Sequence, residues 1–270
     1  MKLSVSVVIP WGNSKSTIDR CIKSVLEQTH RPTEIVVICN NTITRRDGET
    51  LQRLYEDKVI VLVLDGFTNA NIARNLGAFF SGCSIVAYID ADDWWDAKHL
   101  ELSLMQMETC GCDLLYSGYR AYLKDGRVLE RAARFCLPSE TIEQYLLSKC
   151  PAPTSSFLVR KMLFHKITWD CSLRRHQDYD FLARAYRVAK VGVKSDITVN
   201  YEARNKSYRI PHIEDAFRVT RMWYGLVDRK TWFSHVFYLA KHLFFSLSIV
   251  AIYEFLRCLM AKKTVGQTND

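Results

Sequence analysis

Three aspartates stand within four positions, and they are the residues of this sequence best placed to do chemistry together: Asp90, Asp92 and Asp93. They directly follow a short apolar run, residues 84–89. Carboxylates this close repel one another, and a hard divalent cation with oxygen ligands relieves the repulsion, commonly with substrate phosphate oxygens in its shell. The cluster therefore predicts a metal site. The alternative is the first turn of a helix, where aspartate is favoured without any metal.

Short runs rich in valine and isoleucine alternate with helix-period segments over the first hundred residues. The runs that predict buried strands are residues 3–9, 34–39, 59–64 and 84–89. The clearest helix is expected to begin after Ser16 as its N-cap. Strands that alternate with helices favour an α/β fold with a mostly parallel sheet flanked by helices. In such sheets, ligands bind beyond the carboxyl ends of the strands.

Polar residues stand at these predicted strand ends. The segments are Pro10-Trp11-Gly12-Asn13, Asn40-Asn41-Thr42, Asp65-Gly66 and the aspartate cluster. We therefore expect one binding edge, built by several strands, with the aspartates as its acidic part.

The remainder of the chain predicts further elements and then a change of composition. Expected are a helix over 97–109, a hairpin over 113–132, a helix over 141–149, a strand over 155–159 and a helix over 179–188. From about residue 211 the chain becomes dense in aromatic residues and predicts two helices, 212–227 and 232–260. We expect a main domain over 1–208 and a helical region over 209–270.

The composition narrows the class of protein. Hydrophobic residues make up 48% and charged residues 24%, which excludes a disordered chain. A net charge of +8 suits a polyanionic partner, whether nucleic acid, anionic lipid or a phosphorylated small molecule, and also suits a merely basic surface. The nine cysteines form no C-x-x-C pair, which favours free thiols in a reducing cytoplasm, and no signal peptide is evident at the N-terminus.

Several segments together resemble family 2 glycosyltransferases of the GT-A fold. They run in order through roughly residues 3–200: Val5–Pro10, Ser24–Thr29, Glu34–Val37, Asn71–Gly77, Tyr88–Trp94 and Gln177–Phe181. The resemblance implies an inverting, metal-dependent hexosyltransferase that moves a sugar from a nucleotide diphosphate, usually UDP, to a hydroxyl of a saccharide or lipid-linked saccharide in surface polysaccharide or glycolipid synthesis. It divides the main domain into a nucleotide-binding half, about 1–95, and an acceptor-binding half, about 96–208.

The resemblance also assigns roles to single residues. It implies that Asp92 and Asp93 bind Mn²⁺ or Mg²⁺, that Asp90 and Asp92 contact the nucleotide, and that Asp178 is the catalytic base. Asp180 is the second candidate for the base. Asp178 also fits a helix N-cap, a role compatible with catalysis.

The nucleotide-binding residues implied outside the acidic cluster are Pro10, Trp11, Asn13, Asn40 and Arg74. Asn40 stands where the family carries an aspartate that accepts the uracil N–H, so GDP, dTDP and CMP donors stay open beside UDP. Trp11 replaces a smaller residue, and its indole fits either a stacking face for the base or the core. For Arg74 the alternative to a nucleotide contact is an ion pair.

The apolar run over 243–253 is too short to cross a membrane, which needs about 20 residues as a helix. A basic-flanked aromatic helix fits the inner face of the cell membrane as a peripheral contact, and it equally fits packing on the protein or on a second copy. Other functions stay open: a catalytically impaired glycosyltransferase-like binding protein, a nucleotidylyltransferase, or a basic nucleic-acid-binding protein. The absence of a glycine-rich phosphate loop and the scattered Lys and Arg argue against the last two.

Overall fold

The computed structural model describes seven stretches of the chain: residues 3–12, 15–40, 42–64, 69–149, 152–203, 212–243 and 249–261. The chain divides into two compact units. The first consists of Met1–Phe135, Pro151–Ser172 and Arg184–Asn205, and the second of Cys136–Cys150, Leu173–Ala183 and Lys206–Asp270. The helical region predicted from residue 209 thus shares its unit with two earlier segments.

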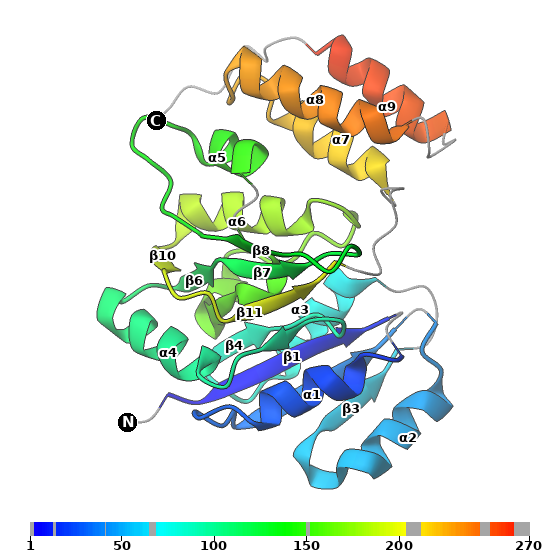
Figure 1. Ribbon diagram of the computed structural model, residues 1–270, viewed down its shortest axis with the longest axis vertical. Coiled ribbons are helices and arrows are strands. Elements are labelled where there is room, and N and C mark those ends of the chain that lie inside the picture. The colour runs from blue at the N-terminus through cyan, green and yellow to red at the C-terminus, as the bar shows by residue number, and fades with distance from the viewer. Residues whose placement is uncertain are drawn as a thin grey trace. The chain divides into compact units, whose positions relative to one another are not determined.

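A seven-stranded sheet forms the centre of the first unit (Figure 1). Its order is β10-β6-β9-β4-β1-β2-β3. The strands are β1 (Val5–Trp11), β2 (Glu34–Cys39), β3 (Ile60–Val63), β4 (Ile85–Tyr88), β6 (Leu114–Ser117), β9 (Leu158–Arg160) and β10 (Val191–Lys194). Neighbouring strands are parallel except that β9 runs antiparallel to both β4 and β6. The predicted α/β fold with a mostly parallel sheet is confirmed.

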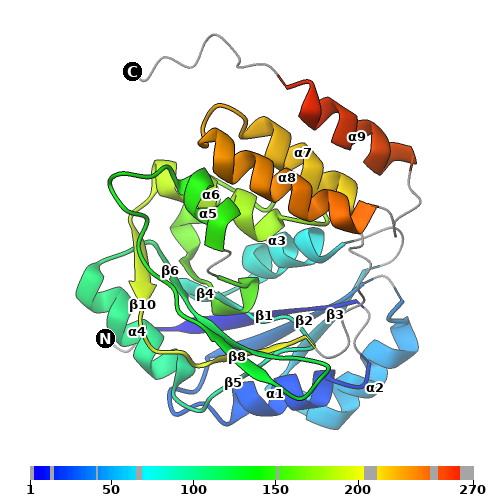
Figure 2. The same ribbon diagram turned by 45° about the horizontal axis from the view of Figure 1, so that its top comes forward.

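Helices cover both faces of this sheet (Figure 2). They are α1 (Ile18–Leu26), α2 (Arg45–Tyr55), α3 (Ala70–Phe80) and α4 (His99–Cys110). Residues of α1, α2 and α4 share one core cluster with Val5, Val7 and Ile9 of β1. On the opposite face, α3 lies so close to β1 that a Cβ on Gly77 would stand 2.3 Å from a methyl carbon of Val8. The alternation of side chains along β1 therefore separates the two helical layers.

A second, four-stranded sheet has the order β5-β11-β7-β8. Its strands are β5 (Trp94–Trp95), β7 (Tyr119–Tyr122), β8 (Val128–Arg131) and β11 (Val199–Glu202). The predicted hairpin exists between β7 and β8, but the run before it is two strands in two sheets, β6 and β7. Gly118 stands at the change of sheet, where a Cβ would lie 2.1 Å from the carbonyl oxygen of Arg131. Only glycine fits that approach.

The second unit is helical. It contains α5 (Ile142–Lys149), the start of α6 (Gln177–Val188), α7 (Ile213–Met222), α8 (Arg229–Leu243) and α9 (Ile249–Leu259). The prediction of two C-terminal helices was wrong, since the described residues there form three. None of the helices in the described part of the chain is long and apolar enough to cross a membrane.

Three short 3-10 helices and one disulfide complete the described structure. Short 3-10 helices lie at η1 (Glu56–Lys58), η2 (Thr154–Ser156) and η3 (Lys161–His165). Cys110 and Cys112 form a disulfide, so the expectation of free thiols fails for this pair, while the other cysteines that the structure describes are not disulfide-bonded.

Candidate active site

The loop after β4 carries the aspartates as a tight turn, in which the Asp93 N–H donates to the carbonyl of Asp90 (2.9 Å). Helix α1 holds the backbone of this turn. The hydroxyl of Thr17 donates to the carbonyl of Ala91 (2.8 Å), and the guanidinium of Arg20 donates to that of Asp92 (2.7 Å). The helix begins at Ile18 with Thr17 rather than Ser16 as its N-cap residue, and the Thr17 side chain makes no cap hydrogen bond. That hydroxyl supports the acidic loop instead.

Asp93 is the buried member of the cluster, with no exposed surface. One of its carboxylate oxygens accepts the N–H of Glu202 from β11 (2.9 Å), and the other accepts the hydroxyl of Ser155. The same Ser155 oxygen accepts the N–H of Asp90 (3.1 Å). Asp93 therefore joins the turn to β11 and to the segment before β9.

Asp90 forms an ion pair with Arg74 of α3, with 2.7 Å between Nη2 and Oδ1. The guanidinium also donates to the side chain of Asn71 (2.8 Å) and lies 4.9 Å from the ring centroid of Trp169. Arg74 is 1% exposed, whereas the Asp90 side chain keeps 33% of its surface. Arg74 thus lies behind Asp90, and its direct contact with a nucleotide stays a prediction.

Asp92 is partly exposed, unlike Asp93. Within the described residues, no group of three or more Asp, Glu, His or Cys side chains is arranged to hold a metal ion. The predicted convergence of all three aspartates on one cation is therefore absent. Two partly exposed carboxylates, Asp90 and Asp92, still provide the oxygen chemistry that Mg²⁺ and Mn²⁺ prefer, with room for substrate oxygens. This geometry favours Asp92 over Asp93 as a direct ligand.

The end of β2 lies on the other side of β1, because the local strand order is β4-β1-β2. Asn40 follows β2, and its N–H donates to the carbonyl of Trp11 (3.0 Å). The Asn40 side chain is 1% exposed, and both of its amide atoms are buried without a hydrogen-bond partner among the residues described. A buried amide left unpaired costs free energy, so this side chain suits a ligand that supplies the missing donor and acceptor.

The other residues predicted after β1 are less accessible. Trp11 is 4% exposed and belongs to the core cluster beneath the sheet, which favours the core alternative, and its contact with a nucleotide stays a prediction. Pro10 is also buried, within β1. Asn13 lies outside the described residues.

Asp178 lies in the second unit, in the first turn of α6. It is partly exposed, and its Oδ1 accepts the N–H of Tyr179 (3.1 Å). His176 precedes the helix in the left-handed conformation, with φ +58°, and its ring stacks on Tyr179 at 4.4 Å between centroids. The N-cap alternative for Asp178 was wrong, because α6 already begins at Gln177 and Asp178 is its second residue. Its role as the base stays a prediction.

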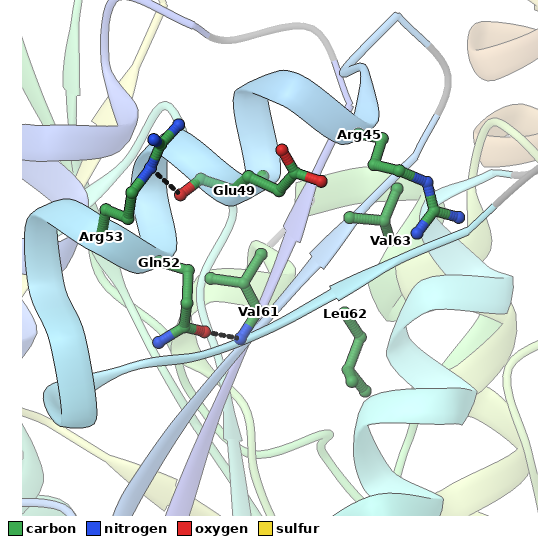
Figure 3. A pocket seen from close by; sticks show the side chains of 8 residues that line it. Arg45, Glu49, Gln52, Arg53, Val61, Leu62 and Val63 are labelled. Atoms are coloured by element: carbon green, nitrogen blue, oxygen red, sulfur yellow. Dashed lines mark hydrogen bonds between the residues drawn. The ribbon is translucent and has the colours of Figure 1, made fainter.

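A separate hollow of about 560 Å³ lies between α2 and β3, and it contains no predicted site residue (Figure 3). Gln52 spans it: its amide oxygen accepts the N–H of Val61 (3.0 Å), while its amide nitrogen donates to the carbonyls of Glu56 (2.6 Å) and Val59 (2.8 Å). Because β3 is the last strand of the sheet, these bonds satisfy backbone groups at a free edge. Gln52 therefore has a structural role at this edge of the sheet.

Three residues that support the acidic turn were not predicted. Ser155 was predicted only as the first residue of a strand, and Arg20 reads as a surface charge on the polar side of α1. Glu202 contributes its backbone N–H to Asp93 and its carboxylate to Arg20 (3.2 Å). No local signal distinguishes these residues, since their role arises from contacts distant in sequence.

Comparison with known proteins places this geometry in context. The chain is 29% identical over 129 residues to the "Putative teichuronic acid biosynthesis glycosyltransferase TuaG" of Bacillus subtilis, covering 47% of this chain and 51% of that protein. It is 25% identical over 146 residues to the "UDP-Glc:alpha-D-GlcNAc-diphosphoundecaprenol beta-1,3-glucosyltransferase WfgD" of Escherichia coli, covering 54% and 56%. The matches thus span about half the length of these relatives.

The fold is similar to that of solved structures. The crystal structure of S. aureus TarS 1-349 matches with a TM-score of 0.67 at 19% identity, covering 95% of this chain and 81% of that one. TarS 1-349 in complex with UDP-GlcNAc matches with a TM-score of 0.66 at 17% identity, covering 95% and 80%. The family model described as Glycosyl transferase family 2 matches residues 6–187, a span that takes in the acidic turn, Asn40, Arg74 and Asp178. Since that span is more than half of the 270 residues, the chain belongs to glycosyl transferase family 2.

Proposed function

We propose that the protein is an inverting glycosyltransferase that transfers a hexose from UDP to a hydroxyl of a saccharide or lipid-linked saccharide. The observation that carries the proposal is the immobilised acidic turn. Its backbone is held by α1 and its buried Asp93 by two distant segments, while Asp90 and Asp92 keep partly exposed carboxylates at the carboxyl end of the sheet. Ligands bind at that edge in α/β folds.

Asn40 supports the choice of a nucleotide donor. Its amide offers one acceptor and two donors, all unpaired among the described residues, and a uracil edge presents an N–H beside carbonyl oxygens. Two of the solved structures with this fold are complexes with UDP and with UDP-GlcNAc. UDP is therefore the donor nucleotide that we assign.

Asp178 is the base of the proposed reaction. Its carboxylate takes the proton of the acceptor hydroxyl, the hydroxyl oxygen forms the new bond to the anomeric carbon, and the bond from that carbon to the diphosphate breaks, leaving the electron pair on UDP. Displacement from the opposite face inverts the anomeric centre. Asp92, with Asp90 beside it, would hold Mn²⁺ or Mg²⁺, which when bound stabilises negative charge on the departing diphosphate.

The names of two relatives support the choice of acceptor and process. The name of WfgD gives it a diphosphoundecaprenol-linked acceptor, and that of TuaG a part in teichuronic acid biosynthesis. We assign this protein to surface polysaccharide or glycolipid synthesis, acting at the inner face of the cell membrane, where such lipid-linked acceptors are used.

The test of the base compares two first-turn residues of α6. Asp178→Asn should keep UDP affinity, measured by calorimetry, and lower transfer from UDP-sugars by about 100-fold or more, because general-base catalysis contributes that much. Asp180→Asn is the matched control and should keep transfer. Loss of transfer in the control alone would move the base to Asp180. A wild-type chain that binds UDP but transfers from no UDP-sugar would instead be a catalytically impaired binding protein.

A further inference from the structure

Helix α9 exposes its large apolar side chains and buries a charged one, the opposite of a usual amphipathic helix. The residues that it buries are Ala251, Glu254 and Cys258, at helical spacing. Its exposed residues are all apolar or aromatic: Ile249, Val250, Ile252, Tyr253, Leu256, Leu259 and Met260 just beyond its end. A helix of a soluble domain normally packs its large apolar side chains inward. Here the protein turns them outward.

The buried side of α9 packs against α7 through a hydrogen bond and an ion pair. The thiol of Cys258 donates to the carbonyl of Phe217 (3.1 Å). Glu254 is buried and pairs with Arg221 of α7 (3.4 Å) and with Arg257 of its own helix (3.5 Å). A charged anchor of this kind fixes which side of the helix faces the protein, because an unpaired buried carboxylate would be costly. The outward apolar side is therefore part of the folded unit.

The neighbouring helix α8 has a similar character. It exposes the aromatic residues Phe233, Phe237 and Tyr238. Between residues 229 and 263 the sequence holds six Lys and Arg but a single acidic residue, the buried Glu254. Arg229, Lys230 and Lys241 of α8 are exposed. The exposed charges of these two helices are thus entirely positive.

We propose that the apolar outer face, defined as the exposed residues of α9 together with Phe233, Phe237 and Tyr238, lies on an anionic lipid bilayer. Aromatic and aliphatic side chains enter the interface, and the flanking cations meet the negative headgroups. At 11 residues α9 is about 16 Å long, too short to span the hydrocarbon core, so it lies along the surface. A second copy of the chain fits less well, because a self-contact would bring these cations together.

Flotation of the full chain with vesicles tests this proposal independently of glycosyl transfer. We expect binding to phosphatidylcholine vesicles that contain phosphatidylglycerol, and weaker binding to phosphatidylcholine alone or at high salt. Ile252→Asp combined with Leu256→Asp should weaken binding at least about tenfold, since both side chains would leave water on docking. Leu54→Asp, at an exposed apolar residue of α2, is the control and should bind like the wild type.

Two results would overturn the proposal. One is equal binding of the double variant, with its fold verified by circular dichroism. The other is a wild-type chain that does not bind anionic vesicles and sediments as a dimer, while the double variant sediments as a monomer. That result would assign the apolar outer face to contact with a second copy.

Discussion

The imidazole rings of His176 and His235 lie with their Nε2 atoms 3.1 Å apart, both buried, so the start of α6 is tied to α8. His235 also donates to the backbone of Leu147 in α5. In the shared bond, one ring donates its Nε2–H and the other accepts at an unprotonated Nε2. Two protonated rings could not share this bond, because neither Nε2 would then have a lone pair to accept it.

Acid should weaken the second unit through this pair. Burial lowers the pKa of His235 to about 4, and burial followed by His235 itself lowers the pKa of His176 well below its usual value. As pH falls below about 6.5, the unfolded chain binds protons first, so stability present above that pH is lost progressively towards pH 4. Each histidine contributes up to about 1.4 kcal/mol per pH unit in that window.

The free energy of unfolding should be measured by urea denaturation at several pH values between about 7.5 and about 4.5. His235→Gln keeps hydrogen-bonding groups but does not titrate, so its stability should fall less steeply with acid than that of the wild type. His165→Gln removes an exposed histidine and should leave the curve unchanged. Parallel curves for wild type and His235→Gln would contradict the assignment.

Arg74 should matter more for stability than any exposed arginine. Arg74→Leu leaves the Asp90 carboxylate without its 2.7 Å partner and should destabilise the fold by about 1–3 kcal/mol, with water at the partly exposed Asp90 limiting the loss. Arg127→Leu breaks an exposed pair with Asp125 and should destabilise the fold much less, because water screens that pair. Thermal and urea unfolding of the two variants measure the difference, and equal losses would refute a special role for the Arg74 pair.

Changing Asp92 or Asp93 to asparagine should have different effects: the first on metal-dependent UDP affinity, the second on the stability of the fold. Asp92→Asn should keep stability and lose the gain in UDP affinity that Mn²⁺ confers, since Asp92 is the partly exposed carboxylate. Asp93→Asn turns one buried acceptor into a donor facing Ser155 or the Glu202 N–H, and should destabilise the fold by about 1–3 kcal/mol. Calorimetry with and without Mn²⁺ and urea unfolding form the test. UDP binding by the wild type that is indifferent to Mn²⁺ would remove the proposed metal.

Gln52 should stabilise the edge of the large sheet. Gln52→Ala removes three hydrogen bonds to backbone groups of Val61, Glu56 and Val59 and should lower the free energy of unfolding by about 1–3 kcal/mol. Amide hydrogen exchange at Val61 should rise with it. Thr50→Ala on the same helix loses one local bond to Arg46 and serves as the control. Unchanged exchange at Val61 would show that water replaces the Gln52 oxygen at no cost.

The parallel part of the fold could be predicted because its information is local. Runs such as residues 34–39 are short, rich in valine and isoleucine, and became β2 with the same bounds. The split at Gly118 was missed, because the need for glycine arises from Arg131 across the hairpin. Trp11 likewise offered no local means of choosing between site and core. Its side chain follows the inward alternation of β1, which only the finished sheet defines.

In the candidate site, too, the features that depend on residues distant in sequence could not be predicted. The spacing of the aspartates in the sequence indicated a site. The burial of Asp93, however, depends on Ser155 and Glu202, which lie 62 and 109 residues further along the chain. The second unit was harder still to foresee, because α9 reverses the rule by which apolar residues are assigned to a core.

The antiparallel strand β9, inserted between β4 and β6, has a consequence for the order of events during synthesis. A nascent chain that has emerged only as far as β8 already contains every aspartate of the acidic turn, yet it lacks both Ser155 and the β11 backbone that secure Asp93. Loops of this length close slowly compared with helices. The turn therefore reaches its final form only after Ser155 and β11 have both been synthesised and packed against it, so the arrangement that we propose for binding a cation should appear late.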